Sequence, residues 1–262
     1  MDKKTEEKLA CSLTAETTEL LPFLPYLLQD LWELGSNPRD MIRLIKKHML
    51  IPTDSRNAKI LDIACGKGAV AVKIAESLGV NVYGFDLLPD FIEYARQKAK
   101  ELNVSPLCHF AIADANEIVN MEANYDCVIF GAAGNILGSP QETLNKLLKT
   151  VKPNGFILID ESYLPDGSGG EEIKYQNYEY LTHGQWMRLF KDSGLKLVEE
   201  AQPAEEYNFD SDNRAIAARA KELSAKRPEK RAIFEGYVQS QLNECDDLDN
   251  NLASVTWMLQ KL

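Results

Sequence analysis

The sequence is poor in cysteine and histidine. Its five cysteines are spread over 262 residues without a Cys-x-x-Cys pair, and it has only three histidines. An odd number of scattered cysteines excludes a disulfide framework and a structural zinc site, so we expect no bound metal. This use of cysteine is typical of a protein from a reducing cytosol.

Long apolar runs are also lacking. The most apolar stretch, residues 20–28, contains two prolines and is too short to span a bilayer. The N-terminus carries charges of both signs and no apolar core follows it, so no signal peptide is visible. We therefore expect a cytoplasmic protein without a membrane partner.

Basic residues are outnumbered, 29 against 40 acidic ones, and the net charge is −11. Both halves of the chain are acidic, which argues against a general binder of nucleic acid or of anionic membranes. Hydrophobic residues make up 45% and charged residues 26%, as in globular proteins. The length fits one large α/β domain, or one domain with a substantial insertion.

From residue 58 onward, strand-like and helical runs alternate. The seven strand-like runs are KILDI, VNVYGFD, LCHFAIAD, YDCVIFG, FILIDE, LKLVEEA and SVTWMLQ. Such alternation predicts a doubly wound, mostly parallel α/β sheet with crossover helices. The turn at 152–155 marks the entry to FILIDE, and residues 162–172 read as a loop.

The remaining segments are predicted to be helical. Residues 9–34 are helical in pieces, broken at Pro22 and Pro25, and a clearer helix starts after Asn37 and ends before Pro52. Residues 211–244 are mostly helical, with an interruption near Pro228. We therefore divide the chain into an N-terminal helical cap, 1–52, and a main domain, 53–262, with a helical insertion at 204–250.

The most informative segment joins the first strand to the second. A buried strand ends near Asp62, Gly66 and Gly68 form a turn, and a helix begins. Glycine lets the backbone approach a ligand, and the start of a helix presents free N–H groups. Asp86, eighteen residues after Gly68 at the end of the next strand, can accept both hydroxyls of a ribose.

Two cofactors compete for this turn. Gly66-x-Gly68-x-x-Ala71 matches the dinucleotide fingerprint, a weak pattern when taken alone. Asp62 precedes the glycines at the strand end, where its carboxylate would repel a pyrophosphate. It would instead favour an ammonium and a sulfonium, and S-adenosylmethionine carries both and has no phosphate.

The segment LDIACGKG resembles the glycine-rich first motif of class I S-adenosylmethionine-dependent methyltransferases. The similarity continues through Asp86, AIADA at 111–115, YDCVIFGAAG at 125–134 and LLKTVKPNGFILIDE at 147–161, and so covers about 58–200. Ala64 stands where the family usually has its first glycine. The resemblance implies a Rossmann-like fold, and S-adenosylhomocysteine as the product.

The resemblance also implies ten cofactor-binding positions, which follow the ends of consecutive strands. The methionine portion would be held by Asp62 and by the backbone of Ala64, Gly66 and Gly68. Asp86 would bind the ribose, Leu87 would pack on the adenine, and Asp114 and Ala115 would meet its edge. Phe130 and Gly131 would lie beside the sulfonium and the acceptor.

Each of these roles has a structural alternative. The glycines can form a plain tight turn, and Asp114 can be a helix cap. Cys65 reads as a small packed residue, and Lys67 is expected to be solvated.

No catalytic base stands out. Methyl transfer from a sulfonium mainly needs alignment of the nucleophile and exclusion of water, so a base is not obligatory. The weak candidates are Glu161, Tyr163 and His183. After the YDCVIF strand comes GAAGNILG rather than the Asp/Asn-Pro-Pro-aromatic motif linked to amide or nucleobase nitrogens, which weakens nucleic-acid acceptors.

The acceptor pocket is expected from the N-terminal helices, the 162–183 loop and the insertion. Tyrosines beside carboxylates in that loop can hold an amine or cation, or can form a solvated surface. The favoured function is methyl transfer to a small molecule. A protein or RNA methyltransferase, a non-catalytic S-adenosylmethionine-binding protein and a homodimer all stay open.

Overall fold

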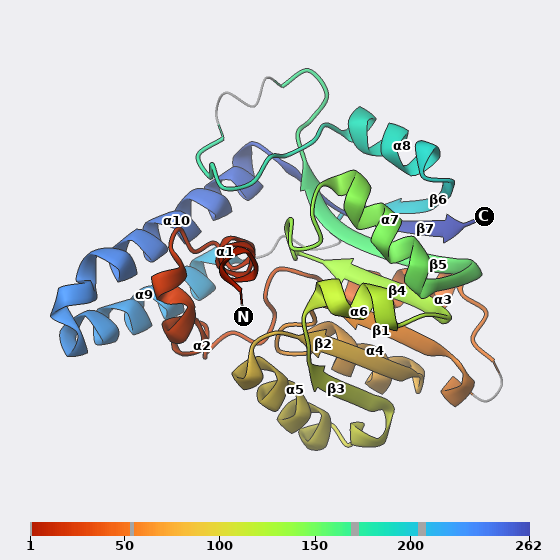
Figure 1. Cartoon of the computed structure of the whole chain (residues 1–262), viewed down its shortest axis with the longest axis horizontal. Coiled ribbons are helices and arrows are strands. Elements are labelled where there is room, and N and C mark those ends of the chain that lie inside the picture. Colours follow the sequence, from red (N-terminus) through yellow and green to blue (C-terminus); the bar gives the residue numbers. More distant parts are fainter. Residues whose placement is uncertain (1, 53–54, 169–172, 204–207) are drawn as a thin grey trace.

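Seven strands form one sheet in a computed structural model that describes residues 2–52, 55–168, 173–203 and 208–262 (Figure 1). Their order is β3-β2-β1-β4-β5-β7-β6, and β7 alone runs antiparallel to its neighbours. The strands are β1 (Lys59–Ile63), β2 (Asn81–Asp86), β3 (Cys108–Ile112), β4 (Tyr125–Gly131), β5 (Val151–Tyr163), β6 (Leu195–Ala201) and β7 (Ala253–Lys261). The predicted seven-stranded, mostly parallel α/β fold is confirmed.

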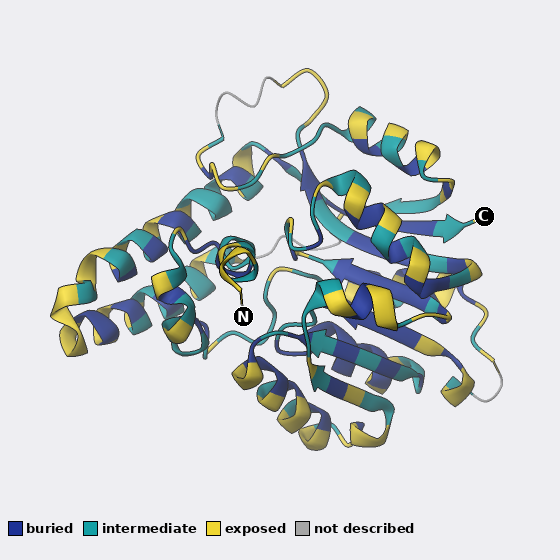
Figure 2. Ribbon diagram, viewed as in Figure 1, coloured by how far each residue is buried: buried dark blue, intermediate teal, exposed yellow. Residues whose placement is uncertain are grey.

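Helices cover both faces of the sheet. One apolar core joins the sheet to α3 (Pro38–His48), α4 (Ala69–Leu78) and α5 (Pro89–Glu101). A second core on the other face holds α6 (Ala115–Met121), α7 (Pro140–Thr150) and α8 (His183–Asp192). The strands between them are correspondingly buried (Figure 2). No helix in the described ranges is long and apolar enough to cross a membrane.

The order of the strands reverses at β1, which pairs in parallel with β2 on one side and with β4 on the other. Four of its five residues are buried, because helices lie on both faces. Helices leaving β1 and β4 turn to opposite faces, and this opens a crevice at the carboxyl ends of the two strands. The sheet thus places the segments after β1, β2 and β4 at one edge.

Helices from both ends of the chain meet beyond that edge. They are α1 (Lys3–Ser12), α2 (Leu24–Leu27), α9 (Phe209–Lys226) and α10 (Arg231–Asn250), with the short helical turns Thr18–Phe23 and Pro228–Lys230. In Figure 1, α9 and α10 lie beside α1 and α2, away from the sheet. From here on we call these helices from both ends of the chain the helical cap; it includes α9 and α10 and leaves out α3, unlike the segment 1–52. A third apolar core, which includes Leu24, Leu27, Phe234 and Tyr237, holds it together.

The helical insertion before the last strand is therefore present as α9 and α10. Its first residues, 204–207, lie outside the described part of the chain. The division of the chain into domains at 52/53 stays a prediction.

Several boundaries differ from the sequence expectation. Pro22 lies inside a 3₁₀ turn and Pro25 is the second residue of α2, so neither proline interrupts a helix. Proline is tolerated in the first turn of a helix because backbone N–H groups there have no partner within the helix, so the lack of an N–H costs no hydrogen bond. β5 begins at Val151, which pairs with Tyr125, so the expected entry turn at 152–155 is an irregularity within the strand.

The same strand also continues past its expected end. Ser162 and Tyr163 pair with Ser254 and Ala253 of β7, so the following loop starts later than expected.

Candidate active site

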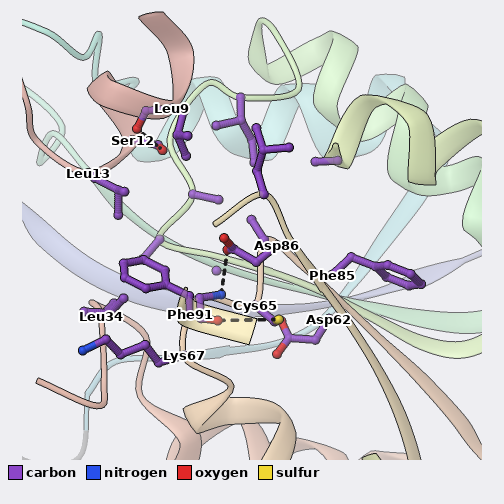
Figure 3. Close-up of a pocket in the computed structure, with 18 of the residues that line it drawn as sticks. Leu9, Ser12, Leu13, Leu34, Asp62, Cys65, Lys67, Phe85, Asp86 and Phe91 are labelled. Carbon is purple, nitrogen blue, oxygen red and sulfur yellow. Dashed lines mark hydrogen bonds between the residues drawn. The ribbon is translucent and has the colours of Figure 1, made fainter. Parts of the chain in front are cut away.

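A cavity opens at the carboxyl ends of β1, β2 and β4, and residues of α1 line its far side (Figure 3). Its empty volume is about 1000 Å³, including the part open to solvent. We call it the first cavity. Eight of the ten expected cofactor positions line it, namely Asp62, Ala64, Gly66, Asp86, Leu87, Asp114, Ala115 and Gly131.

The turn between β1 and α4 winds through the left-handed region of backbone space. The φ angles of Ala64, Gly66 and Gly68 are 58°, 53° and 71°. Glycine adopts this region freely, whereas the Cβ of Ala64 is strained there. The turn brings the N–H of Gly66 to 2.9 Å from Asp86 Oδ2.

Asp86 closes the turn from the end of β2. Its Oδ2 accepts from the N–H of Gly66, and its Oδ1 accepts from the N–H of Leu88, both at 2.9 Å. Burial raises the pKa of its carboxyl group, against the lowering effect of these hydrogen bonds. Each carboxylate oxygen has two lone pairs, so both can still accept from hydroxyl groups in the cavity.

Asp62 is the most unusual group in the first cavity. It is 4% exposed, and its Oδ2 has no hydrogen-bond partner among the described residues. Burial, and then the charge of Asp86, raise the pKa of Asp62 to about 7. A buried acceptor without a donor is costly, so this oxygen fits a ligand that brings a positive donor such as an ammonium group.

Gly68 and Phe130 do not line the cavity, so their expected contacts with the cofactor lack geometric support. The N–H of Gly68 is already bonded to Cys65 O at 2.9 Å. A Cβ at Gly68 would lie 2.6 Å from the Cβ of Ala95, so this glycine allows α4 and α5 to pack closely. Phe130 belongs to the core beneath α6–α8, because successive side chains of a strand point to opposite faces.

Asp114 caps α6. Its Oδ1 accepts from the N–H of Asn116 at 2.7 Å, so the structural alternative considered for this residue is present. The residue also lines the first cavity, and its Oδ2 lies 3.5 Å from the hydroxyl of Thr5 on α1. A contact between Asp114 and adenine stays a prediction.

Lys67 is buried, contrary to the expectation that it is solvated. It is 3% exposed, and its ammonium group donates to the carbonyl oxygens of Leu28 and Leu31. Nζ lies 4.8 Å from the ring centroid of Tyr94, and burial lowers the pKa of Lys67 to about 8. Figure 3 shows this side chain leading away from Asp62 and Asp86. It therefore fastens the turn to the segment that follows α2.

Cys65, in the same turn, is expected to be a poor nucleophile. Burial and the charges of Asp62 and Asp86 raise the pKa of its thiol well above the usual value. A thiol that stays protonated reacts poorly.

A second cavity adjoins the first and has an empty volume of about 1540 Å³, including its open part. Its wall comes from the N-terminal segments, the end of β5, the segment around 175–180, and helices α9 and α10. Four residues line both cavities: Ser12, Leu13, Leu34 and Ala132. The three regions expected to form an acceptor pocket therefore meet here.

Of the three candidates for chemistry, only Glu161 lines the second cavity. Tyr163 is buried, with its ring 5.9 Å from that of Trp257. His183 Nε2 lies 2.6 Å from Glu200 Oε2, and the ring of His183 lies 5.1 Å from that of Tyr163, tilted by 57°. His183 lines neither cavity. The structure therefore gives neither Tyr163 nor His183 a place beside a reacting group.

The fold and the first cavity together define a class of protein. An open sheet with a buried carboxylate at the end of β1, a glycine turn and a second carboxylate at the end of β2 is the arrangement of Rossmann-like methyltransferases. Asp62 is the feature that disfavours a dinucleotide, because its carboxylate lines the cavity and would repel a pyrophosphate there.

The chain belongs to the family described as the methyltransferase domain, whose model matches residues 54–220. It is a class I methyltransferase with S-adenosylmethionine as its cofactor. Over 180 residues it is 25% identical to the ubiquinone/menaquinone biosynthesis C-methyltransferase UbiE of Rickettsia peacockii (strain Rustic), covering 66% of this chain and 71% of that protein.

Solved structures share the fold. The structure of YjhP from E. coli matches with a TM-score of 0.72 and 19% identity, over 98% of this chain and 100% of that one. A methyltransferase from Geobacter sulfurreducens in complex with S-adenosylhomocysteine matches with a TM-score of 0.74 and 20% identity, over 90% and 96%.

Proposed function

We propose that the enzyme transfers a methyl group from S-adenosylmethionine, bound in the first cavity, to a small molecule bound in the second. The observation that carries this proposal is the shared lining of the two cavities by Ser12, Leu13, Leu34 and Ala132. Occupants of two adjoining cavities meet at such a border, which is what an in-line displacement requires.

The residues of the first cavity suit this cofactor. We assign the unpaired Oδ2 of Asp62 to the ammonium of the methionine portion and the two oxygens of Asp86 to the ribose hydroxyls. Ala64 and Gly66 bring backbone close to the same region. When bound, S-adenosylmethionine supplies an already activated methyl group, so the protein contributes orientation and the exclusion of water.

The second cavity favours a small acceptor because the helical cap covers it. Its wall includes the buried side chains of Tyr175, Ile216 and Tyr237, which shield an occupant from water. The UbiE relative is a C-methyltransferase of ubiquinone/menaquinone biosynthesis, which is compatible with a small-molecule acceptor. An extended macromolecule would need an open groove instead.

The test has two parts. Calorimetry should show binding of S-adenosylhomocysteine and no binding of NAD. Cofactor with a labelled methyl group should then label the low-molecular-mass fraction of a metabolite extract, while a matched fraction of protein and RNA stays unlabelled. Binding of NAD in place of the nucleoside, or label confined to macromolecules, contradicts the proposal.

A further inference from the structure

The second cavity is lined by acidic residues without basic ones. Among the residues that the structure describes, no lysine, arginine or histidine lines it. Six residues with carboxylate side chains do: Glu33, Asp40, Asp160, Glu161, Asp212 and Glu244. Glu33 pairs with Lys73, and Asp40 with Arg43 at 3.5 Å, so basic side chains outside the cavity balance these two.

Asp160, Glu161 and Glu244 make no ion pair within the described ranges. Only neutral groups hold them: the hydroxyl of Thr256 donates to Asp160 at 2.8 Å, that of Tyr178 to Glu161 at 2.7 Å, and that of Thr14 to Glu244 at 2.5 Å. Neutral donors satisfy lone pairs but leave the net negative charge in place. The cavity therefore has a negative potential that attracts a cation.

The pKa values of these three carboxyl groups are raised, mainly by burial. Burial raises the pKa of Glu161 to about 7 and that of Asp160 to about 6, and it also raises the pKa of Glu244. The negative charges of Asp160 and Glu244 add to the rise at Glu161, which shows that strand β5 and helix α10 bring these groups near one another. A cation among them would lower all three pKa values and so favour the ionised carboxylates.

Aromatic rings accompany the carboxylates. Tyr175, Tyr178, Tyr180 and Tyr237 line the cavity, and the rings of Tyr178 and Tyr180 lie 4.9 Å apart, edge to face. The face of such a ring attracts an organic cation. Carboxylates and tyrosine rings together suit an ammonium group attached to an apolar body.

The hydroxyl of Tyr237 is an independent sign of a ligand. Tyr237 is 1% exposed, and its hydroxyl has no hydrogen-bond partner among the described residues although the side chain lines the cavity. Glu244 lies two turns further along α10 on the same face, and it too lines the cavity. A buried hydroxyl without a partner is costly, so a polar occupant is expected here.

We infer that the acceptor bound in the second cavity carries a protonated amine, held by Glu161 and Glu244 and surrounded by tyrosine rings. This inference rests on the proposed function, because it assumes that the occupant of the second cavity is the methyl acceptor. An acceptor that carries a phosphate or carboxylate beside these residues is disfavoured, because no cation among the described lining residues would balance it.

The test compares three ligands of similar shape and different charge. Phenethylamine, 2-phenylethanol and 3-phenylpropanoate are titrated into the full chain saturated with S-adenosylhomocysteine. We expect the amine to bind about tenfold tighter than the alcohol, since charge-assisted hydrogen bonds are stronger than neutral ones, and the carboxylate to bind most weakly. Binding of the alcohol or the carboxylate as tight as that of the amine, or no binding of the amine, overturns the inference.

Two variants that each remove one negative charge test whether the preference for the amine comes from Glu161. Glu161→Gln keeps an acceptor for Tyr178 and should remove most of the preference for phenethylamine. Glu76→Gln, on the exposed side of α4, should leave it unchanged. Both variants should bind S-adenosylhomocysteine as the wild type does, which shows that they are folded.

The outcomes separate the two proposals. Loss of preference in both variants contradicts a local role for Glu161. Intact cofactor binding without amine selectivity contradicts the inference alone. Failure of the wild type to bind S-adenosylhomocysteine contradicts the proposed function.

Discussion

The two cavities differ in how their walls are built and in how their carboxylates are held. The first is formed by turns that follow neighbouring strands, and backbone N–H groups fix Asp86 within it. The second is assembled from segments as distant as Thr14 and Glu244, which side-chain hydroxyls and carboxylates connect. One site is set by local turn geometry, and the other exists only when the helical cap packs onto the sheet.

The difference explains how one fold can keep its cofactor and change its acceptor. The turns of the first cavity follow directly from the carboxyl ends of parallel strands, so the cofactor position follows from the strands themselves. Cap helices touch the sheet through side chains, so their lining residues can differ without disturbing the turns. The predictions below test this separation.

The largest effect is expected from Asp86→Ala. The change removes an acceptor for two ribose hydroxyls and releases the N–H of Gly66, so we expect the affinity for S-adenosylhomocysteine to fall about 100-fold or more. Calorimetry measures it. Glu161→Gln in the second cavity serves as the control with unchanged affinity, and equal affinity of the Asp86 variant and the wild type would refute the assignment of the ribose site.

A pair of glycine substitutions separates packing from ligand contact. Gly68→Ala places a Cβ 2.6 Å from that of Ala95 at a φ of 71°, and we expect it to lower the free energy of unfolding by about 2–4 kcal/mol. Gly66→Ala meets only Leu34, at 3.4 Å, so it should cost about 1–2 kcal/mol.

Cofactor binding should show the opposite ranking. Gly66 lines the first cavity and Gly68 does not, so Gly66→Ala should weaken the binding of S-adenosylhomocysteine more. Urea unfolding and calorimetry on both variants measure the two rankings. If both rankings run the same way, Gly68 has a ligand role as well.

A pH effect on stability is expected from Glu161. Its folded pKa of about 7 lies above its ordinary value of 4.5, so the folded state holds a proton more tightly than the unfolded state. The contribution of this group is therefore fully present below about pH 4.5 and is lost as the pH rises through about 7. Asp160 on the same strand and Glu244 on α10 add negative charge, while Tyr178 donates to the carboxylate.

Glu161→Gln removes this loss. The variant should melt at a higher temperature than the wild type near about pH 8, with a smaller difference near about pH 4. Thermal unfolding of both proteins across this range checks the sign. A difference that grows toward acid pH would show that the carboxylate is stabilised in its ionised form.

The smallest effect is expected from Ala64→Gly. Ala64 holds a φ of 58°, where glycine is unstrained, so the change should raise the free energy of unfolding by about 1 kcal/mol or less. The affinity for S-adenosylhomocysteine should stay the same, since the backbone keeps its course. Chemical unfolding and calorimetry test both points, and a loss of stability would show that the Cβ of Ala64 makes a favourable contact.

The strands and the first cavity were largely predictable because their determinants are local. Asp62 and Asp86 each end a buried apolar run, and parallel strands bring such ends to one edge. Two details were not predictable. The burial of Lys67 depends on carbonyl oxygens nearly forty residues away in the sequence. The side chain of Phe130 packs in the core under α6–α8 and not in the cavity, which depends on the face of the sheet to which that position of β4 points.

The second cavity was predicted only by region. Glu161 was named, but Tyr237 and Glu244 were not, because the insertion gives no motif. A signal was present: Tyr237, Gln241, Glu244 and Leu248 recur at helical spacing on α10 and all line the cavity. Polar residues on the buried face of a helix indicate that this face lines a cavity and not an apolar core. The sequence alone does not identify the cavity, because that depends on how the helix packs in the tertiary structure.

Lys67 has a further consequence for how the molecule comes apart. Its ammonium group joins the turn after β1 to the carbonyl oxygens of Leu28 and Leu31. The indole N–H of Trp32 donates in return to the backbone carbonyl oxygen of Lys67, at 3.1 Å. These hydrogen bonds link the turn to the segment after α2 through a buried ammonium group. Separating the two would leave that charge buried without its acceptors, which is costly. We therefore expect the turn and the N-terminal segment to unfold together. The enzyme would then lose its affinity for the cofactor in the same transition in which its N-terminal helices detach.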